Sequence, residues 1–153
     1  MTLRKIISGG QTGADQAGLL AAGALGLETG GTAPPGYMTD AGPQPTLLMR
    51  YGLVEGEPDT RIYPRRTEKN VLDSDGSVIF GNQFSPGCQL TIRLCTKYRK
   101  PCIINPTPLD LYIFVLTNNI SVLNVAGNRE RTNPGIGARV VCIIMDAFGK
   151  KEV

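Results

Sequence analysis

The chain has 153 residues, of which 41% are hydrophobic and 19% are charged, and its formal net charge is +3 at pH 7. This length and composition indicate one globular domain over residues 1–153 and exclude a largely disordered protein. The small positive charge suits an anionic small molecule and is too weak to indicate nucleic-acid binding. Because histidine is absent, Ser–His and Cys–His catalysis and the commonest zinc sites are excluded.

The four cysteines form no C-x-x-C motif and lie among apolar residues: Cys88, Cys95, Cys102 and Cys142. Such thiols are typically reduced packing residues, so we expect a cytoplasmic protein. The sequence has no apolar run of the kind that forms a secretory signal or a membrane span. We therefore expect neither a membrane nor a nucleic acid as a partner.

The first predicted elements flank a glycine-rich turn. Residues 3–8 are expected to form a strand, and residues 14–27 form a helix with small apolar residues at helical spacing. Thr12 is the expected helix cap, with Asp15 as its capping-box partner. Residues 28–32 follow as a short second strand.

The middle of the chain, residues 33–64, is rich in proline and glycine. We predict a long binding loop or flap there, with one helical turn or more over residues 47–53. Beyond it, helices are expected over residues 65–75, 85–98, 107–118 and from residue 133 onward. Strands over residues 77–80, 101–105 and 121–126 separate them, and this alternation predicts an α/β fold whose mainly parallel sheet carries helices on both faces.

In such a sheet, ligands bind beyond the carboxyl ends of the strands. Turns at Gly9-Gly10, Gly81 and Gly127 follow three predicted strands, and we expect them to face one crevice. A strand–glycine turn–helix directs backbone N–H groups at an anion, and the missing Cβ atoms allow close approach. A turn needed only for packing is the alternative. The first candidate binding residues are Gly9, Gly10, Gln11, Thr12, Gly13 and Asp15, and Gly127 belongs to the same crevice.

A second candidate anion site is the helix start after residue 80. Its residues are Ser85, Gly87, Cys88 and Gln89, and ordinary helix capping explains them equally well. No base accompanies Cys88, so we expect this thiol to line the ligand or pack rather than act as a nucleophile.

The third candidate group lies at the end of the predicted helix over residues 65–75. Asn70, Asp73 and Asp75 would contact the polar organic part of a ligand, because the helix dipole disfavours carboxylates at a helix C-terminus. Simple turn chemistry is the alternative. No metal-ligand spacing occurs, so no metal bound directly by side chains is predicted, and the catalytic residues are unknown.

Several motifs occur in one order over nearly the whole chain: Ser8-Gly9-Gly10-Gln11-Thr12-Gly13-Ala14-Asp15, Gly30-Gly31, Asn70-Val71 with Asp73-Ser74-Asp75, and Asn124-Val125-Ala126-Gly127. This set resembles the family of molybdenum carrier proteins, also called molybdenum cofactor carrier proteins. That family lies within the Rossmann-like superfamily of the lysine-decarboxylase-like LOG proteins. The resemblance implies a doubly wound Rossmann-like sheet, a homo-oligomer of two or four chains, and a phosphate-bearing ligand, either the molybdenum cofactor or a nucleotide.

The leading hypothesis is therefore a small-molecule binding protein, a cofactor carrier that holds phosphate at glycine-rich turns. The alternative is a LOG-like hydrolase that cleaves the N-glycosidic bond of a nucleotide. LOG enzymes carry a P-G-G-x-G-T-x-x-E pattern, whereas the matching residues 85–91 lack the double glycine, and no glutamate follows in the helix. A third hypothesis is an interaction protein that kept the fold and lost the site.

Overall fold

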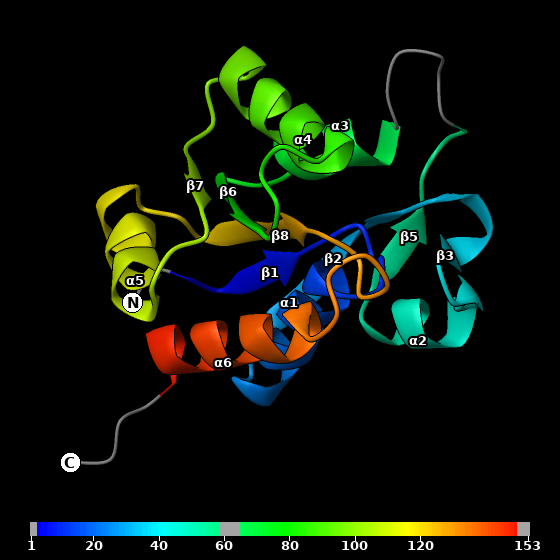
Figure 1. Cartoon of the computed structure of the whole chain (residues 1–153), viewed down its shortest axis with the longest axis horizontal. Helices are drawn as coiled ribbons and strands as arrows, with labels where there is room; N and C mark the ends of the chain where they lie inside the picture. The colour runs from blue at the N-terminus through cyan, green and yellow to red at the C-terminus, as the bar shows by residue number, and fades with distance from the viewer. Residues whose placement is uncertain (1–2, 59–64, 150–153) are drawn as a thin grey trace.

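The computed structural model describes residues 3–58 and 65–149. In this part of the chain, six parallel strands form one sheet in the order β5-β2-β1-β8-β6-β7, with helices on both faces (Figure 1). This arrangement confirms the predicted α/β, doubly wound, Rossmann-like fold. The strands are β1 (Lys5–Ile7), β2 (Glu28–Ala33), β5 (Leu53–Glu55), β6 (Gly76–Phe80), β7 (Cys102–Ile104) and β8 (Val122–Gly127).

Two groups of helices cover the sheet (Figure 1). One group comprises α1 (Ala14–Ala24), α5 (Pro108–Thr117) and α6 (Ile136–Phe148), in which α6 packs against both α1 and α5. The other group comprises α3 (Arg65–Leu72) and α4 (Pro86–Lys97), which lie side by side above the sheet in Figure 1. No helix in the described part of the chain is long and apolar enough to cross a membrane.

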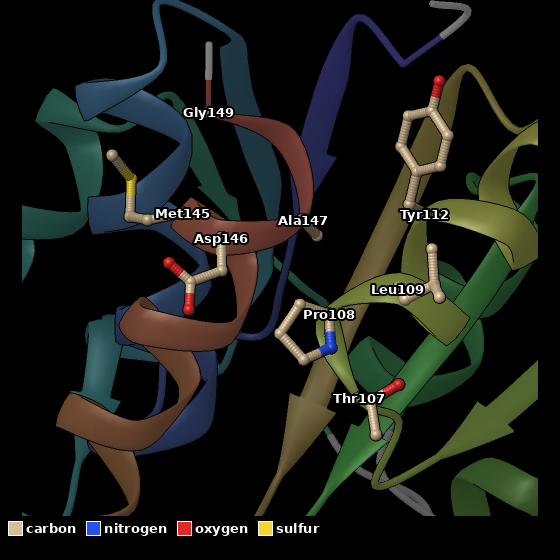
Figure 2. A pocket seen from close by; sticks show the side chains of 8 residues that line it. All are labelled: Thr107, Pro108, Leu109, Tyr112, Met145, Asp146, Ala147 and Gly149. Atoms are coloured by element: carbon tan, nitrogen blue, oxygen red, sulfur yellow. The ribbon is translucent and has the colours of Figure 1, made fainter. Parts of the chain in front are cut away.

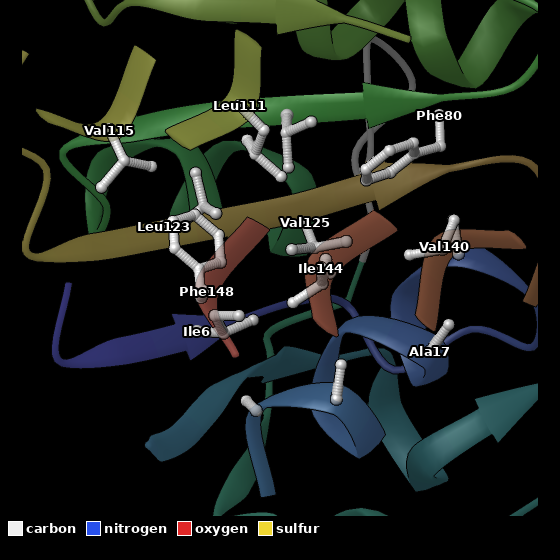
Figure 3. Packing of buried hydrophobic residues seen from close by; sticks show 14 of the residues in the cluster. Ile6, Ala17, Phe80, Leu111, Val115, Leu123, Val125, Val140, Ile144 and Phe148 are labelled. Carbon is white, nitrogen blue, oxygen red and sulfur yellow. The ribbon is translucent and has the colours of Figure 1, made fainter. Parts of the chain in front are cut away.

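The main hydrophobic core fills the space between the sheet and the first helix group (Figure 3). Ile6 of β1 and Val125 of β8 face Ile144 of α6, and all three side chains are fully buried. The small residues of α1 bring it close to the sheet: a Cβ atom on Gly18 would lie 2.8 Å from Val125 Cβ. The small-residue spacing that predicted this helix thus serves close helix-to-sheet packing.

The strand order changes direction between β1 and β8. From β1 the chain adds β2 and then β5 toward one edge, whereas β6, β7 and β8 all lie on the other side of β1. Ile7, the last residue of β1, is in register with Asn124 of β8. A doubly wound sheet binds ligands at such a switch point, beyond the strands' carboxyl ends.

The proline- and glycine-rich stretch is more ordered than the sequence predicts. Between residues 33 and 58 it holds a 3-10 turn η1 (Pro35–Tyr37), a small antiparallel pair β3 (Met38–Thr39) and β4 (Gly42–Pro43), helix α2 (Pro45–Arg50) and β5. The prediction missed β5 because this strand buries only Leu53, which was expected to belong to a helical turn over residues 47–53. Residues 59–64 of the predicted loop lie outside the described residues.

The last helix begins three residues after the predicted start at residue 133. Pro134 does not open it; α6 starts at Ile136, after Gly135 adopts a left-handed φ of 87°. The carboxylate of Glu130 accepts hydrogen bonds from the backbone N–H groups of Gly135 and Gly137. These bonds hold the pKa of Glu130 below its ordinary value. An acidic side chain from the preceding loop thus caps the helix, in place of the predicted Asn-Pro start.

Candidate functional site

A small cleft lies where the carboxyl ends of β1 and β8 meet the first turns of α3 and α4. Its volume is about 120 Å³. Four segments of the chain line it, and its polar walls come from residues far apart in sequence. The lining residues are Gly9, Gln11, Asp15, Arg66, Thr67, Asn70, Gly87, Thr91, Asn124, Val125, Ala126, Gly127 and Arg129.

The glycine turn after β1 does not present free N–H groups to the cleft as predicted. The carboxylate of Asp15 accepts hydrogen bonds from the backbone N–H groups of Gln11, at 3.2 Å, and of Gly9. The N–H of Gly10 donates to the hydroxyl of Ser8, and that of Thr12 donates to the side-chain oxygen of Gln11. The anion in this turn is therefore a side chain of the protein itself.

The predicted capping role of Thr12 is wrong. The N-cap of α1 is Gly13, with φ of 83°, and no side chain caps the helix. A Cβ atom on Gly13 would lie 2.5 Å from the backbone oxygen of Asn128, which also accepts the N–H of Ala14. Glycine is therefore required for both the backbone angle and the contact with the loop after β8. Thr12 and Gly13 lie on the other side of the turn and do not line the cleft.

Asp15 is the carboxylate with the most unusual surroundings among the described residues. Only 7% of its surface is exposed, and burial raises its pKa from 3.8 to about 6. The charge of Arg66, the N–H groups of Gln11 and Gly9, and the charge of Arg129 act in the opposite direction. Desolvation is thus the dominant effect, and Asp15 changes its charge close to neutral pH.

Two arginines give the cleft its positive charge, and the candidate list omitted both. A methyl group on Gly9 would lie 2.6 Å from Arg66 Nη1, which places this guanidinium directly over the turn. Within the described residues, the Arg66 guanidinium has no hydrogen-bond or salt-bridge partner, so its donors are free for a ligand. Arg129 instead forms a salt bridge with Asp40 at 2.8 Å. The sequence signal for Arg66 is its place at the start of the predicted helix over residues 65–75, where a forked guanidinium suits phosphate and a solvated basic face is the alternative.

Asp40 holds both cationic residues of the loop after β8. Its Oδ1 accepts from Arg129, and its Oδ2 lies 3.3 Å from Arg131 Nε in a second salt bridge. This Oδ2 has no hydrogen-bond partner in the described part of the chain, but Arg131 Nη2 donates to Oδ1 at 3.4 Å, so both arginines are hydrogen-bonded to Asp40. The pairing joins the β3–β4 hairpin to the rim of the cleft.

The predicted cluster of Asn70, Asp73 and Asp75 is divided by the structure. Asn70 lines the cleft, and its amide bonds both backbone groups of Thr32, which ties α3 to β2. Asp73 forms an exposed salt bridge with Lys69, and Asp75 accepts the N–H groups of residues 121 and 122. Because α3 runs antiparallel to the strands, its last turn lies at the amino edge of the sheet, so placing these two aspartates with Asn70 is wrong.

The start of α4 contributes less than expected. Gly87 lines the cleft, and so does Thr91 one turn later, which the candidate list omitted. Ser85 accepts a hydrogen bond from the Asn128 side chain, which also lies 3.7 Å from Cys88 Sγ. The side chain of Gln89 donates to the backbone oxygen of residue 83. Ser85, Cys88 and Gln89 therefore support the helix start behind the wall of the cleft.

Among the three glycine turns, those after β1 and β8 line the cleft, through Gly9 and Gly127. Gly81 does not, because it packs against Asn128: a Cβ atom there would lie 2.1 Å from Asn128 Oδ1. The remaining lining residues of β8 include Asn124, whose amide donates to Ser77 Oγ. The expectation of one crevice thus holds for two of the three turns.

A larger cavity, of about 820 Å³, lies between α5 and α6 (Figure 2). Figure 2 shows Pro108, Leu109 and Tyr112 of α5 on one side and Met145 of α6 on the other. Its walls are mostly apolar, and it shares no residue with the cleft at the strand ends. Binding sites for small molecules combine apolar walls with a few convergent polar groups. The smaller cleft has such polar groups, so it is the better candidate despite its small volume.

Comparison with known proteins agrees with the fold and with the resemblance seen in the sequence. No curated protein matches the chain. The crystal structure of a "putative molybdenum carrier protein" from Syntrophus aciditrophicus SB is 33% identical and superposes with a TM-score of 0.83, covering 97% of this chain and 96% of that one. A model of the circularly permutated YpsA SLOG family matches residues 6–148. The chain therefore belongs to the circularly permutated YpsA family of SLOG proteins, the molybdenum-carrier type that its motifs indicate.

Proposed function

We propose that this protein binds the phosphate-bearing end of a small molecule in the cleft between β1, β8, α3 and α4, and that it acts as a carrier. The observation that carries the proposal is the free guanidinium of Arg66, which lies over Gly9 in a polar cleft at the switch point of the sheet. Arginine donors suit phosphate oxygens because the planar fork can bond two of them.

The position of the bound phosphate follows from which donors are occupied. The N–H groups of residues 9–12 are bonded to protein acceptors, as described above. Arg66, Thr67 and Gly87 at the first turn of α4 line the same space, whereas the hydroxyl of Thr91 beside them already donates to the backbone oxygen of Gly87. The N-terminus of α4 adds its partial positive charge. The phosphate thus sits between α3 and α4, beside the glycine turn rather than within it.

The molybdenum cofactor is one candidate ligand, because the similar protein from Syntrophus aciditrophicus carries molybdenum in its name. The donor set of the cleft fits the phosphate of this pterin. Its volume of about 120 Å³ is below the roughly 300 Å³ of a typical small-molecule site, so the pterin would extend beyond the cleft. The cofactor would supply the molybdenum, since the described residues hold no cluster of three metal-ligating side chains. A nucleotide meets the same requirements for a phosphate.

The test is titration of purified protein with AMP and with molybdenum cofactor released from a molybdenum enzyme, followed by calorimetry and thermal unfolding. An Arg66→Ala variant should lose about 10- to 100-fold in affinity, because a hydrogen bond to a charged group contributes roughly 1.5–3 kcal/mol. Arg93→Ala, on the exposed side of α4, is the matched control and should bind like the unmodified protein. Absence of binding by both ligands, or equal affinity of the Arg66→Ala and Arg93→Ala variants, would contradict the proposal.

The second candidate function is nucleotide hydrolysis, and the observation that favours it is Asp15. A buried carboxyl with a pKa of about 6 in a cleft has the properties of a general acid or base. Glycosidic cleavage normally uses two carboxylates, whereas Asp15 is the one acidic residue lining the described cleft. Chromatography of AMP after incubation with the protein decides the matter: release of adenine that disappears in Asp15→Asn would establish an enzyme.

A further inference from the structure

We infer that the cleft selects oxyanions that carry or can take up a proton, such as phosphate and phosphate monoesters, over sulfate, and that the Asp15 carboxylate makes this selection. The inference rests on the proposed function, because it concerns the anion-binding end of the same cleft.

The geometry places an acceptor and a donor around one point. A methyl group on Gly9 would lie 3.0 Å from Asp15 Oδ2 and 2.6 Å from Arg66 Nη1. Nevertheless, no salt bridge joins Asp15 to Arg66 in the described part of the chain, so the two groups flank the point without neutralising each other directly. That point is one bond length from Gly9 Cα, so a ligand oxygen lies farther out in the cleft that Gly9, Asp15 and Arg66 line together, where it meets the guanidinium and the carboxylate.

The carboxylate makes the site selective because it can only accept hydrogen bonds when ionised. An oxyanion oxygen without hydrogen is repelled by it, and two such oxygens held close together do not both stay unprotonated. A phosphate O–H satisfies the carboxylate, and a phosphate monoester gains a proton readily, since its second pKa is about 6. Sulfate carries no proton at these pH values and can enter only when Asp15 holds one.

The groups that face Asp15 come from three neighbouring elements. Arg66 of α3 and Arg129 after β8 favour its ionised form, and Cys88 lies on the α4 side. Burial raises the pKa of the Cys88 thiol, so this group is neutral at physiological pH. Because burial also brings the pKa of Asp15 to about 6, acidification to pH 5 supplies the proton that sulfate lacks.

The experiment compares inorganic phosphate with sulfate by calorimetry at pH 7.5 and pH 5, at constant ionic strength. We expect phosphate to bind at least about tenfold more tightly at pH 7.5, since one unpaired buried charge costs more than the ~1.4 kcal/mol that a factor of ten requires. At pH 5 the preference should shrink to about threefold or less. AMP and adenosine 5′-sulfate form a second matched pair, in which only AMP should take up a proton on binding.

Asp15→Asn tests the residue itself, because its amide is uncharged and can donate to an oxygen without hydrogen. This variant should bind phosphate and sulfate about equally, with no change between the two pH values. Asp110→Asn, an exposed carboxylate on α5, is the control and should keep the full preference. If circular dichroism shows that Asp15→Asn does not fold, the test is the change with pH in the preference of the unmodified protein for phosphate over sulfate.

The outcomes separate the two proposals. Equal affinity for the two anions of either pair at pH 7.5 would overturn the selection by Asp15 and leave phosphate binding intact. A preference that Asp15→Asn retains would assign the selection to another group and also overturn the inference. No binding of AMP or of either inorganic anion would overturn the proposed function, and the inference with it.

Discussion

Ionised Asp15 destabilises the folded protein, and the size of this effect follows from its burial. The side chain is 7% exposed, and its pKa in the folded protein is about 6 against an ordinary value of 3.8. At roughly 1.4 kcal/mol for each pH unit between these values, the ionised carboxylate costs the folded state about 3 kcal/mol. Replacement by asparagine removes the charge and keeps the shape.

The sign of the pH dependence is set by proton binding. Between pH 4 and 6 the folded protein holds a proton on Asp15 that the unfolded chain has lost, so this group's contribution to stability falls as pH rises. The contribution is fully present below pH 3.8 and is lost as pH passes through 6. The carboxylate of Glu130, whose pKa is lowered, changes stability in the opposite direction with pH. It is present in both the unmodified protein and the asparagine variant, so its effect cancels in the difference between them.

The assay is urea unfolding of the unmodified protein and of Asp15→Asn at half-unit steps from pH 4 to pH 8, in buffers without phosphate or sulfate. The free energy of unfolding of the unmodified protein should fall by about 2.5 kcal/mol relative to the variant over this range, since the unfolded carboxyl is already partly ionised at pH 4. Asp110→Asn, which removes an exposed carboxylate on α5, is the control for the loss of one negative charge. If the difference in unfolding free energy between the unmodified protein and Asp15→Asn does not change with pH, the reasoning is refuted. If the unmodified protein gains stability relative to the variant as pH rises, the arginine charges outweigh burial.

Three further substitutions test the scaffold. Gly13→Ala should destabilise the protein by about 2 kcal/mol or more in thermal unfolding, since its Cβ would lie 2.5 Å from a backbone oxygen, whereas Gly26→Ala, with open space around it, should cost only about 1 kcal/mol. Ile144→Ala, fully buried in the core, should cost about 2–5 kcal/mol in urea unfolding, far more than Leu116→Ala at a half-exposed position. Thr107→Ala should cost about 1 kcal/mol by loss of the side-chain cap on α5, and Thr107→Ser should restore it.

The sequence alone determined those features that depend on neighbouring residues. Alternating apolar runs, helix-start residues such as Ser85-Pro86 and Thr107-Pro108, and the glycines at strand ends predicted most of the helices and strands correctly. From that alternation the parallel sheet follows, and with it the edge at which a ligand should bind. The short strands β3, β4 and β5 were not predicted, because they lie in the proline- and glycine-rich stretch, where the apolar pattern is interrupted.

The tertiary structure decided which residues meet at that edge and what each one does. Arg66 reaches Gly9 across 57 positions of sequence, and Asp75 lies at the opposite edge because α3 runs back along the sheet. The glycine turn itself shows the difference most clearly: its composition indicated an anion site, and its anion is Asp15, four residues from Gln11. Local sequence sets backbone conformation, whereas the burial and charge that give a side chain its chemistry come from elements that only the fold brings together.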